Sequence, residues 1–240
     1  MTDPSAGAPA PWHERVAVFD LETTGVDPQH ARIVTAFVGI IDAHGDLERG
    51  TDWLADPGVE IPEQASAVHG ITTEMARAEG EPAAQVAAAV RASIEWIARH
   101  GLPLVVFNAP YDLTLLDAEC RRHGLEPVAA RLGEQVVDPL VIDKAVDRYR
   151  KGRRTLVNQA GAYGIDLLDA HTAGDDAVAA GQLAQAIARK FPVEVGGLPL
   201  AELHRRQAAW HDEQAADFES YMRRERDPEF SADRGWPVRG

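Results

Sequence analysis

An acid pair at the end of an apolar strand is the feature of this sequence that most limits how the chain can fold. Residues 16–19 are apolar and rich in valine, and the motif after them ends at Gly25, which predicts a buried strand. Alternate side chains of a strand share one face, so Asp20 and Glu22 are expected to lie side by side. Adjacent carboxylates repel each other, and burial raises the cost of their charge. We therefore expect a bound cation there, and hard oxygen ligands favour magnesium or manganese.

A further acid follows a second apolar segment. Residues 104–107 predict another buried strand, which runs directly into Asn108, Ala109 and Pro110. Proline suits the first turn of a helix, so either Asn108 or Ala109 is expected to be the N-cap. Asp112 then lies in the first turn of that helix, at a strand-to-helix junction.

A histidine and a fourth acid lie near the start of a later helix. An alanine-rich pattern that ends near Lys190 predicts this helix, and Asp176 falls in its first turn, where the helix dipole favours a negative charge. His171 lies in the loop just before it. Asp175 is interpreted as a cap or a surface acid, because Asp176 has the better spacing from His171.

These residues together indicate a chemistry. Two acids on a strand, one at a strand-to-helix turn and one at a helix start fit phosphodiester hydrolysis in which two metal ions clamp the attacking and leaving oxygens. An imidazole with an unperturbed pKa of about 6.5 can take the proton from the attacking water.

The motifs resemble those of a known family, the DEDD exonucleases. The resemblance is carried by the Asp20-x-Glu22-Thr-Thr-Gly motif, by Asn108 with Asp112, and by His171 spaced to Asp176. The histidine is typical of the branch that includes the proofreading subunit of bacterial DNA polymerase III, ribonuclease T and oligoribonuclease. Residues 63–72 also resemble the segment that family members place beside the bound 3′ end. The similarity covers about residues 14 to 192.

The resemblance implies a ribonuclease-H-like fold and removal of nucleotides in the 3′-to-5′ direction. By position it implies His171 as general base and a ligand set for two Mg²⁺ or Mn²⁺ ions. The implied metal ligands are Asp20, Glu22, Asp112 and Asp176. The candidate contacts to the terminal nucleotide are Thr23, Thr24, His69 and Asn108.

Two positions depart from the family pattern. Many relatives have histidine where this chain has Phe107, and phenylalanine where it has Tyr111. Neither change removes a ligand, and both bear on how the terminal nucleotide is held.

The order of elements predicts an α/β protein with a mixed five-stranded sheet flanked by helices. Strands at 33–41 and 47–54 follow the first one with short turns, which favours an antiparallel meander joined to parallel strands. We expect a disordered tail at residues 1–12, an exonuclease domain at 13–192, and a linker with a C-terminal helical extension at 193–240. The apolar stripe of that helix either packs on the domain or binds a polymerase or other protein partner.

Charge and composition set outer bounds. The chain of 240 residues has 24 basic and 38 acidic side chains and a net charge of −14, which is unusual for a nucleic-acid enzyme. Its densest basic run, residues 148–154, is either a solvated loop or a phosphate contact for the incoming strand. The single cysteine, Cys120, and the lack of a signal peptide or a long apolar run indicate a cytoplasmic protein that does not span a membrane.

Other readings of the motifs stay open at this point. The substrate is single-stranded DNA or RNA with a free 3′ end, and an oligoribonuclease-like RNA exonuclease is the main alternative to a DNA enzyme. A haloacid-dehalogenase-like phosphatase also begins with an acid pair on a strand, but that reading leaves Asp112 and His171 without roles. An inactive nucleic-acid-binding module is the third class.

Overall fold

A computed structural model describes residues 10–167 and 172–239 of the chain. Six strands in this part form one sheet, in the order β4-β3-β2-β1-β5-β6. The strands are β1 (Val16–Thr23), β2 (Ile33–Ile41), β3 (Leu47–Asp56), β4 (Glu81–Pro82), β5 (Leu104–Val105) and β6 (Val136–Val137). The first three pair antiparallel, whereas β5 and β6 run parallel to β1. The predicted mixed sheet is therefore confirmed, and the two-residue β4 adds a sixth strand at the edge.

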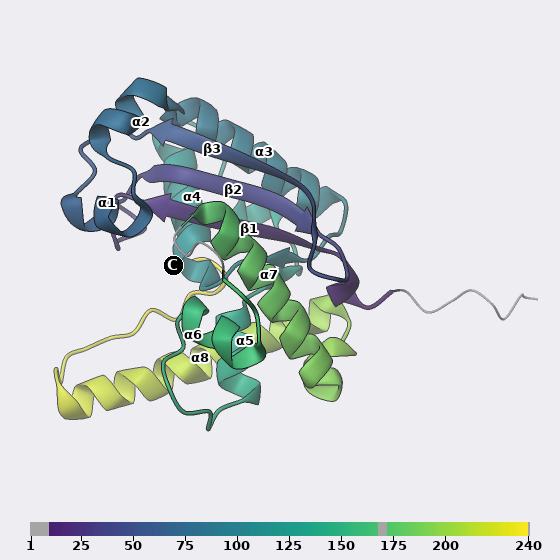
Figure 1. Ribbon diagram of the computed structural model, residues 1–240. Helices are drawn as coiled ribbons and strands as arrows, with labels where there is room; N and C mark the ends of the chain where they lie inside the picture. The colour runs from purple at the N-terminus through teal and green to yellow at the C-terminus, as the bar shows by residue number, and fades with distance from the viewer. Residues whose placement is uncertain (1–9, 168–171, 240) are drawn as a thin grey trace, which may run out of the picture.

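Helices cover both faces of the sheet. They are α1 (Glu63–His69), α2 (Thr73–Glu79), α3 (Ala83–Arg99), α4 (Ala109–Arg122), α5 (Pro139–Val146), α6 (Leu156–Tyr163), α7 (Ala173–Lys190) and α8 (Leu200–Glu225), with short turns at Trp12–Glu14, Ala129–Arg131 and Pro192–Gly196. Figure 1 shows α7 lying across one face and α3 behind the other. One buried core joins the sheet to α3 and α4, and a second joins it to α7.

Strand β1 is an inner strand of the sheet, where it pairs with β2 on one side and β5 on the other. Its side chains alternate between the two cores, so Val16 and Val18 face α7. Gly181 lets α7 approach closely, since a Cβ atom there would lie 2.5 Å from Val18 Cγ1 and 2.6 Å from Ile41 Cδ1. The strand and the middle of α7 are consequently held at a short separation.

A buried carboxylate caps the two helices that follow the parallel strands. The Asp138 side chain is fully buried and accepts backbone N–H bonds from Asn108, Ala109 and Leu140, each at 3.0 Å. Asn108 is the N-cap residue of α4, but it has a left-handed backbone (φ 63°) and its own side chain makes no capping bond. The first turn of α4 is thus fixed by an acid from the junction of β6 and α5.

The C-terminal extension packs on the same junction. Gln207 of α8 accepts the Asp138 N–H at 2.6 Å and donates to the Val136 carbonyl at 3.1 Å. Beyond α8 the chain turns back towards α4 (Figure 1), where the Arg239 N–H donates to Thr114 Oγ1 at 2.9 Å. In the described part of the chain, no helix has the length and apolar character needed to cross a membrane.

We expect Asp138→Asn to destabilise the protein by about 3 kcal/mol. The asparagine amide would replace one acceptor oxygen with an NH₂ group, which would face backbone N–H groups that need an acceptor. The free energy of unfolding in urea measures this loss. Asp227→Asn is the matched control, since Asp227 is exposed and accepts one backbone N–H bond, from Glu229. Equal stability of the two variants would show that Asp138 does not fix α4.

Candidate active site

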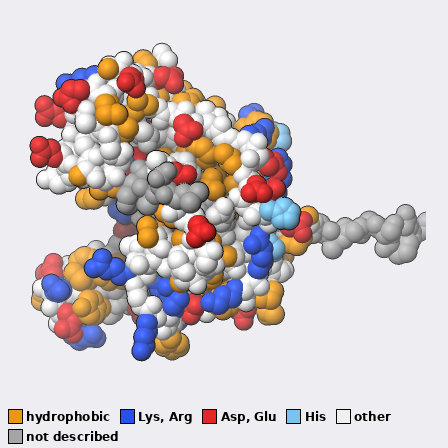
Figure 2. Space-filling view, viewed as in Figure 1, with side chains coloured by type: hydrophobic (Ala, Val, Ile, Leu, Met, Phe, Trp, Pro, Cys, Tyr) orange, Lys and Arg blue, Asp and Glu red, His pale blue; other side chains and the backbone are white. Residues whose placement is uncertain are grey.

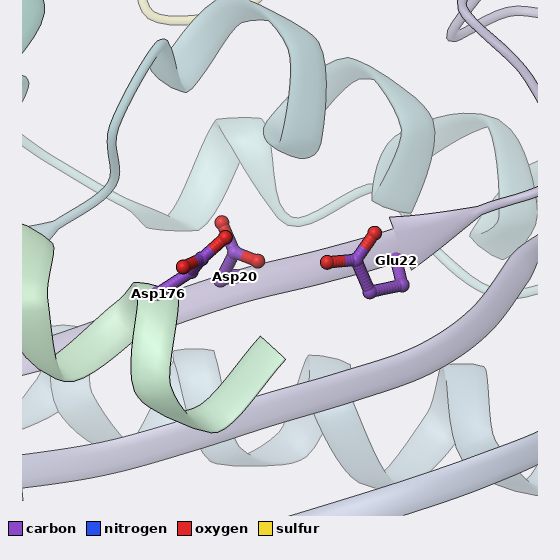
Figure 3. Close-up of side chains that lie close together, drawn as sticks. All are labelled: Asp20, Glu22 and Asp176. Atoms are coloured by element: carbon purple, nitrogen blue, oxygen red, sulfur yellow. The ribbon is translucent and has the colours of Figure 1, made fainter. Parts of the chain in front are cut away.

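Three carboxylates from two elements converge at the end of β1. Oxygen atoms of Asp20, Glu22 and Asp176 lie within 4.8 Å of one another. Figure 3 shows Asp20 and Glu22 side by side on the strand and Asp176 reaching them from the first turn of α7. The strand alternation that packs Val16 and Val18 against α7 directs Asp20 and Glu22 to the same face.

Asp112 lies in the same cleft but outside that group of three. It is in the first turn of α4 and only 4% exposed. Its charge raises the pKa of Asp20, after the larger effect of burial, so the two carboxyl groups interact electrostatically. The cleft has a volume of ≈ 460 Å³ and is lined by all four acids together with Leu21, Val68, Phe107, Asn108, Tyr111, Leu140, Arg154 and Thr155.

Burial and mutual repulsion disfavour the charged forms of these acids. Burial, followed by repulsion from Asp112, Glu22 and Asp176, holds the pKa of Asp20 well above its usual range. Burial and the charge of Asp176 raise the pKa of Glu22 to about 7. Burial also raises the pKa of Asp112. Near neutral pH, such a cluster favours any cation that can replace its protons.

The donor set fits a divalent metal ion. No salt bridge joins Asp20, Glu22 or Asp112 to a Lys or Arg within the described ranges. Arg154 lines the cleft, yet its guanidinium is bonded to the buried Asp143. Hard carboxylate oxygens that converge in a partly buried cleft match the preferences of magnesium and manganese.

The candidate substrate contacts surround this cluster. Thr23 Oγ1 lies 2.5 Å from the Tyr111 hydroxyl, which also donates to the Gly25 carbonyl. Thr24 Oγ1 accepts the Arg32 N–H at 2.9 Å. Both hydroxyl groups therefore order the turn after β1, and the tyrosine in place of phenylalanine supplies one of its hydrogen bonds.

Of the other two candidates, Asn108 lines the cleft, whereas His69 lines a separate pocket that also includes Glu22. Asn108 lines the cleft at the start of α4. His69 is at the end of α1, where its Nδ1 accepts the Ile71 N–H at 3.2 Å. His171 lies outside the described residues, so its predicted role is not tested; α7 begins just after it, with Thr172 as N-cap.

The fold and the acidic cleft define the class to which this chain belongs, the DEDD 3′–5′ exonucleases. Residues 17–184 match the family model described as Exonuclease (RNase T), so the chain is a member of that family. This membership removes the phosphatase alternative.

Curated relatives carry names from DNA replication. The chain is 30% identical over 169 residues to DNA polymerase III subunit epsilon of Treponema pallidum, which covers 69% of this chain and 73% of that protein. It is 36% identical over 101 residues to a DNA polymerase III subunit epsilon-like protein of Rhodobacter capsulatus, which covers 41% of this chain and only 14% of that longer protein.

A solved structure shares the fold. Exonuclease I of E. coli in complex with a dT13 oligonucleotide matches with a TM-score of 0.63 at 21% identity, over 75% of this chain and 42% of that one. The likeness establishes the ribonuclease-H-like architecture of the domain. The chain spans less than half of the length of Exonuclease I.

The raised pKa of Glu22 predicts how stability depends on pH without metal. A folded-state pKa of about 7 means that the native protein binds this proton more tightly than the unfolded chain does. The stabilisation is therefore full below the unfolded pKa of about 4.5 and is lost as the pH rises through about 7. In chelator, Glu22→Gln should be more stable than the unmodified chain by about 1–2 kcal/mol at pH 8, after allowance for solvent screening.

Urea denaturation at pH 5 and pH 8 measures this difference. The gain should be several-fold smaller at pH 5, because Glu22 is then protonated in the folded state. Glu63→Gln, which neutralises an exposed glutamate of α1 outside the cleft, is the control. An unchanged difference at the two pH values would contradict a raised pKa for Glu22.

Proposed function

We propose that this chain is a metal-dependent exonuclease that hydrolyses phosphodiester bonds from the 3′ end of single-stranded nucleic acid. The observation that carries the proposal is the convergence of Asp20, Glu22 and Asp176 within 4.8 Å in an open cleft. Family membership supports the reaction class.

Each acid has a role in the proposal. Asp20, Glu22, Asp112 and Asp176 hold two Mg²⁺ or Mn²⁺ ions. When bound, these ions supply Lewis-acid stabilisation of the charge on the scissile phosphate and lower the pKa of the attacking water. The rigid placement of the acids on β1, α4 and α7 means that little reorganisation is needed at the moment of reaction.

The other candidate residues handle the proton and the terminal nucleotide. His171 lies two positions before the first residue of α7 and five before Asp176, and it is proposed to accept the proton from the attacking water. Thr23, Thr24, His69 and Asn108 are proposed to contact the 3′-terminal nucleotide.

The proposed substrate is DNA ahead of RNA. Its support is the name of the Treponema relative and the oligonucleotide in the Exonuclease I complex. An oligoribonuclease-like action on RNA remains the alternative. A polymerase partner, bound through α8, is proposed from the names of the curated relatives.

Removal of one ligand tests the reaction and its polarity. Purified protein with magnesium should shorten a 5′-labelled single-stranded oligonucleotide stepwise, and Asp20→Asn should lower the rate by about 10³-fold because it removes a charged ligand. Asp56→Asn, an acid outside the cleft, is the matched control. Parallel DNA and RNA strands of one sequence rank the two substrates.

Three outcomes would contradict parts of this proposal. A rate unaffected by chelator would overturn the metal mechanism. Efficient cutting of circular single strands would overturn the 3′-end requirement. Oligonucleotide binding without any cleavage would indicate the inactive binding module.

His171→Ala tests the general base. The chemical step should slow by about 10²–10⁴-fold, the usual worth of a general base, while magnesium binding by the acids is retained. The rate of the unmodified enzyme should rise with pH as the imidazole loses its proton, and the variant should lack this limb. Single-turnover rates from pH 5.5 to 8.5 and calorimetric metal titration measure the two effects. Near-normal turnover of the variant would exclude His171 as the base.

A further inference from the structure

A second pocket adjoins the acidic cleft. Its volume is ≈ 400 Å³, and it shares Asn108 and Leu140 with the cleft as lining residues. Its other walls come from α5, from α8 and from the segment after α8, residues 226–239. Most of this pocket is therefore built by the C-terminal extension, which lies outside the residues that match the family model.

Two basic side chains line this pocket. Neither Lys144 nor Arg239 forms a salt bridge with any residue in the described part of the chain. Burial lowers the pKa of Lys144, and the charges of Asp138 and Asp143 act against that fall, but both acids have bonds of their own. Asp138 accepts three backbone N–H groups, and Asp143 is bonded to two arginines. The Lys144 ammonium thus keeps its capacity to bind an anion.

Arg239 lies at the boundary between the pocket and the cleft. Its backbone N–H is fixed to Thr114 on α4, so the position of the residue does not depend on its side chain. Burial raises the pKa of Tyr111, and the Arg239 charge acts against that rise. Tyr111 lines the acidic cleft, so the Arg239 charge acts from the pocket on the edge of that cleft.

The pocket also offers an aromatic wall. Phe218 of α8 is 51% exposed and meets Phe230 edge-on, with ring centroids 5.4 Å apart. Successive bases of a single strand stack on such exposed rings without sequence preference. Asp233, an acid of the same pocket, accepts the Gly235 N–H at 2.7 Å.

The charge distribution favours the same side of the molecule. Of the 24 basic residues, 15 lie after residue 138, together with 16 of the 38 acids, so nearly all of the net charge of −14 belongs to the first 138 residues. On the face that Figure 2 shows, Lys and Arg side chains are more frequent in the lower half, and acidic side chains are more frequent in the upper half. A polyanion is repelled less on the side of α5 and α8.

We propose that this pocket is a subsite for a nucleotide of the substrate strand upstream of the terminal one, in which Lys144 and Arg239 bind a phosphate and Phe218 stacks on a base. The inference rests on the proposed function, since the strand reaches the pocket from the acidic cleft. By this inference, the C-terminal extension contributes to the preference of the enzyme for substrate strands of a certain length.

Equilibrium binding of short oligonucleotides tests the subsite. Full-length protein with Asp20→Asn, which should leave the strand uncut, is titrated with dT2, dT3, dT4 and dT6 in competition with a labelled probe. Affinity should rise at the length that reaches the pocket. Arg239→Gln should reduce that rise by about fivefold, and Phe218→Ala by about tenfold. The slope of log K against log salt should become shallower by about 0.7 in Arg239→Gln, as expected for one lost phosphate contact to a single strand.

Arg224→Gln is the matched control, because it removes the same charge from α8 outside the pocket and should keep the rise and the salt slope. If the unmodified protein cleaves DNA but the rise in affinity with length persists in both Arg239→Gln and Phe218→Ala, the subsite is overturned and the proposed function is not. Equal losses at every length, dT2 included, would also overturn it. If the unmodified chain neither binds nor cleaves these strands, the proposed function fails and the subsite with it.

Discussion

Repulsion among half-buried carboxylates is the constraint that the remaining structure must resist. Carboxylate oxygens of three acids lie within 4.8 Å of one another, and one of these acids, Glu22, has a pKa of about 7. In a flexible structure their repulsion would move these side chains apart. The chain holds two of them on β1, which is hydrogen-bonded on both sides. The third is on α7, which packs against β1 at van der Waals distance because Gly181 has no side chain. The rigidity that keeps the acids together also keeps the site ready for cations.

Asp138 extends this rigidity to the other wall of the cleft. The buried carboxylate of Asp138 accepts N–H bonds at the starts of α4 and α5. The backbone N–H of Asp138 in turn donates to Gln207 of α8. The helix that carries Asp112 is therefore linked through Asp138 to the C-terminal extension.

The sequence predicts the parts of the site that follow local rules. Strand alternation places Asp20 beside Glu22, proline chemistry starts α4 near Asn108, and the alanine pattern of α7 places Asp176 in its first turn. It does not predict α1, α2 or β4, which are short and carry weak periodic signals. The bonds of Asp138 to the start of α4 have no local signal, because they join residues 29 and 30 positions apart. The return of the chain to Thr114 is likewise a long-range contact without a local signal.

The net charge of −14 is less of an obstacle to nucleic-acid binding than the total implies. Long-range repulsion between exposed charges is screened within about 8 Å at physiological ionic strength, so the charges near the strand matter most. The acids of the cleft are the ones that a bound cation neutralises. Several of the remaining acids are paired locally, as with Glu48 and Arg15 or Asp143 and Arg150. Beyond the cleft, the proposed contacts of a short strand are Lys144, Arg239 and the nearby aromatic wall. An enzyme that binds only a few nucleotides needs no extended basic surface.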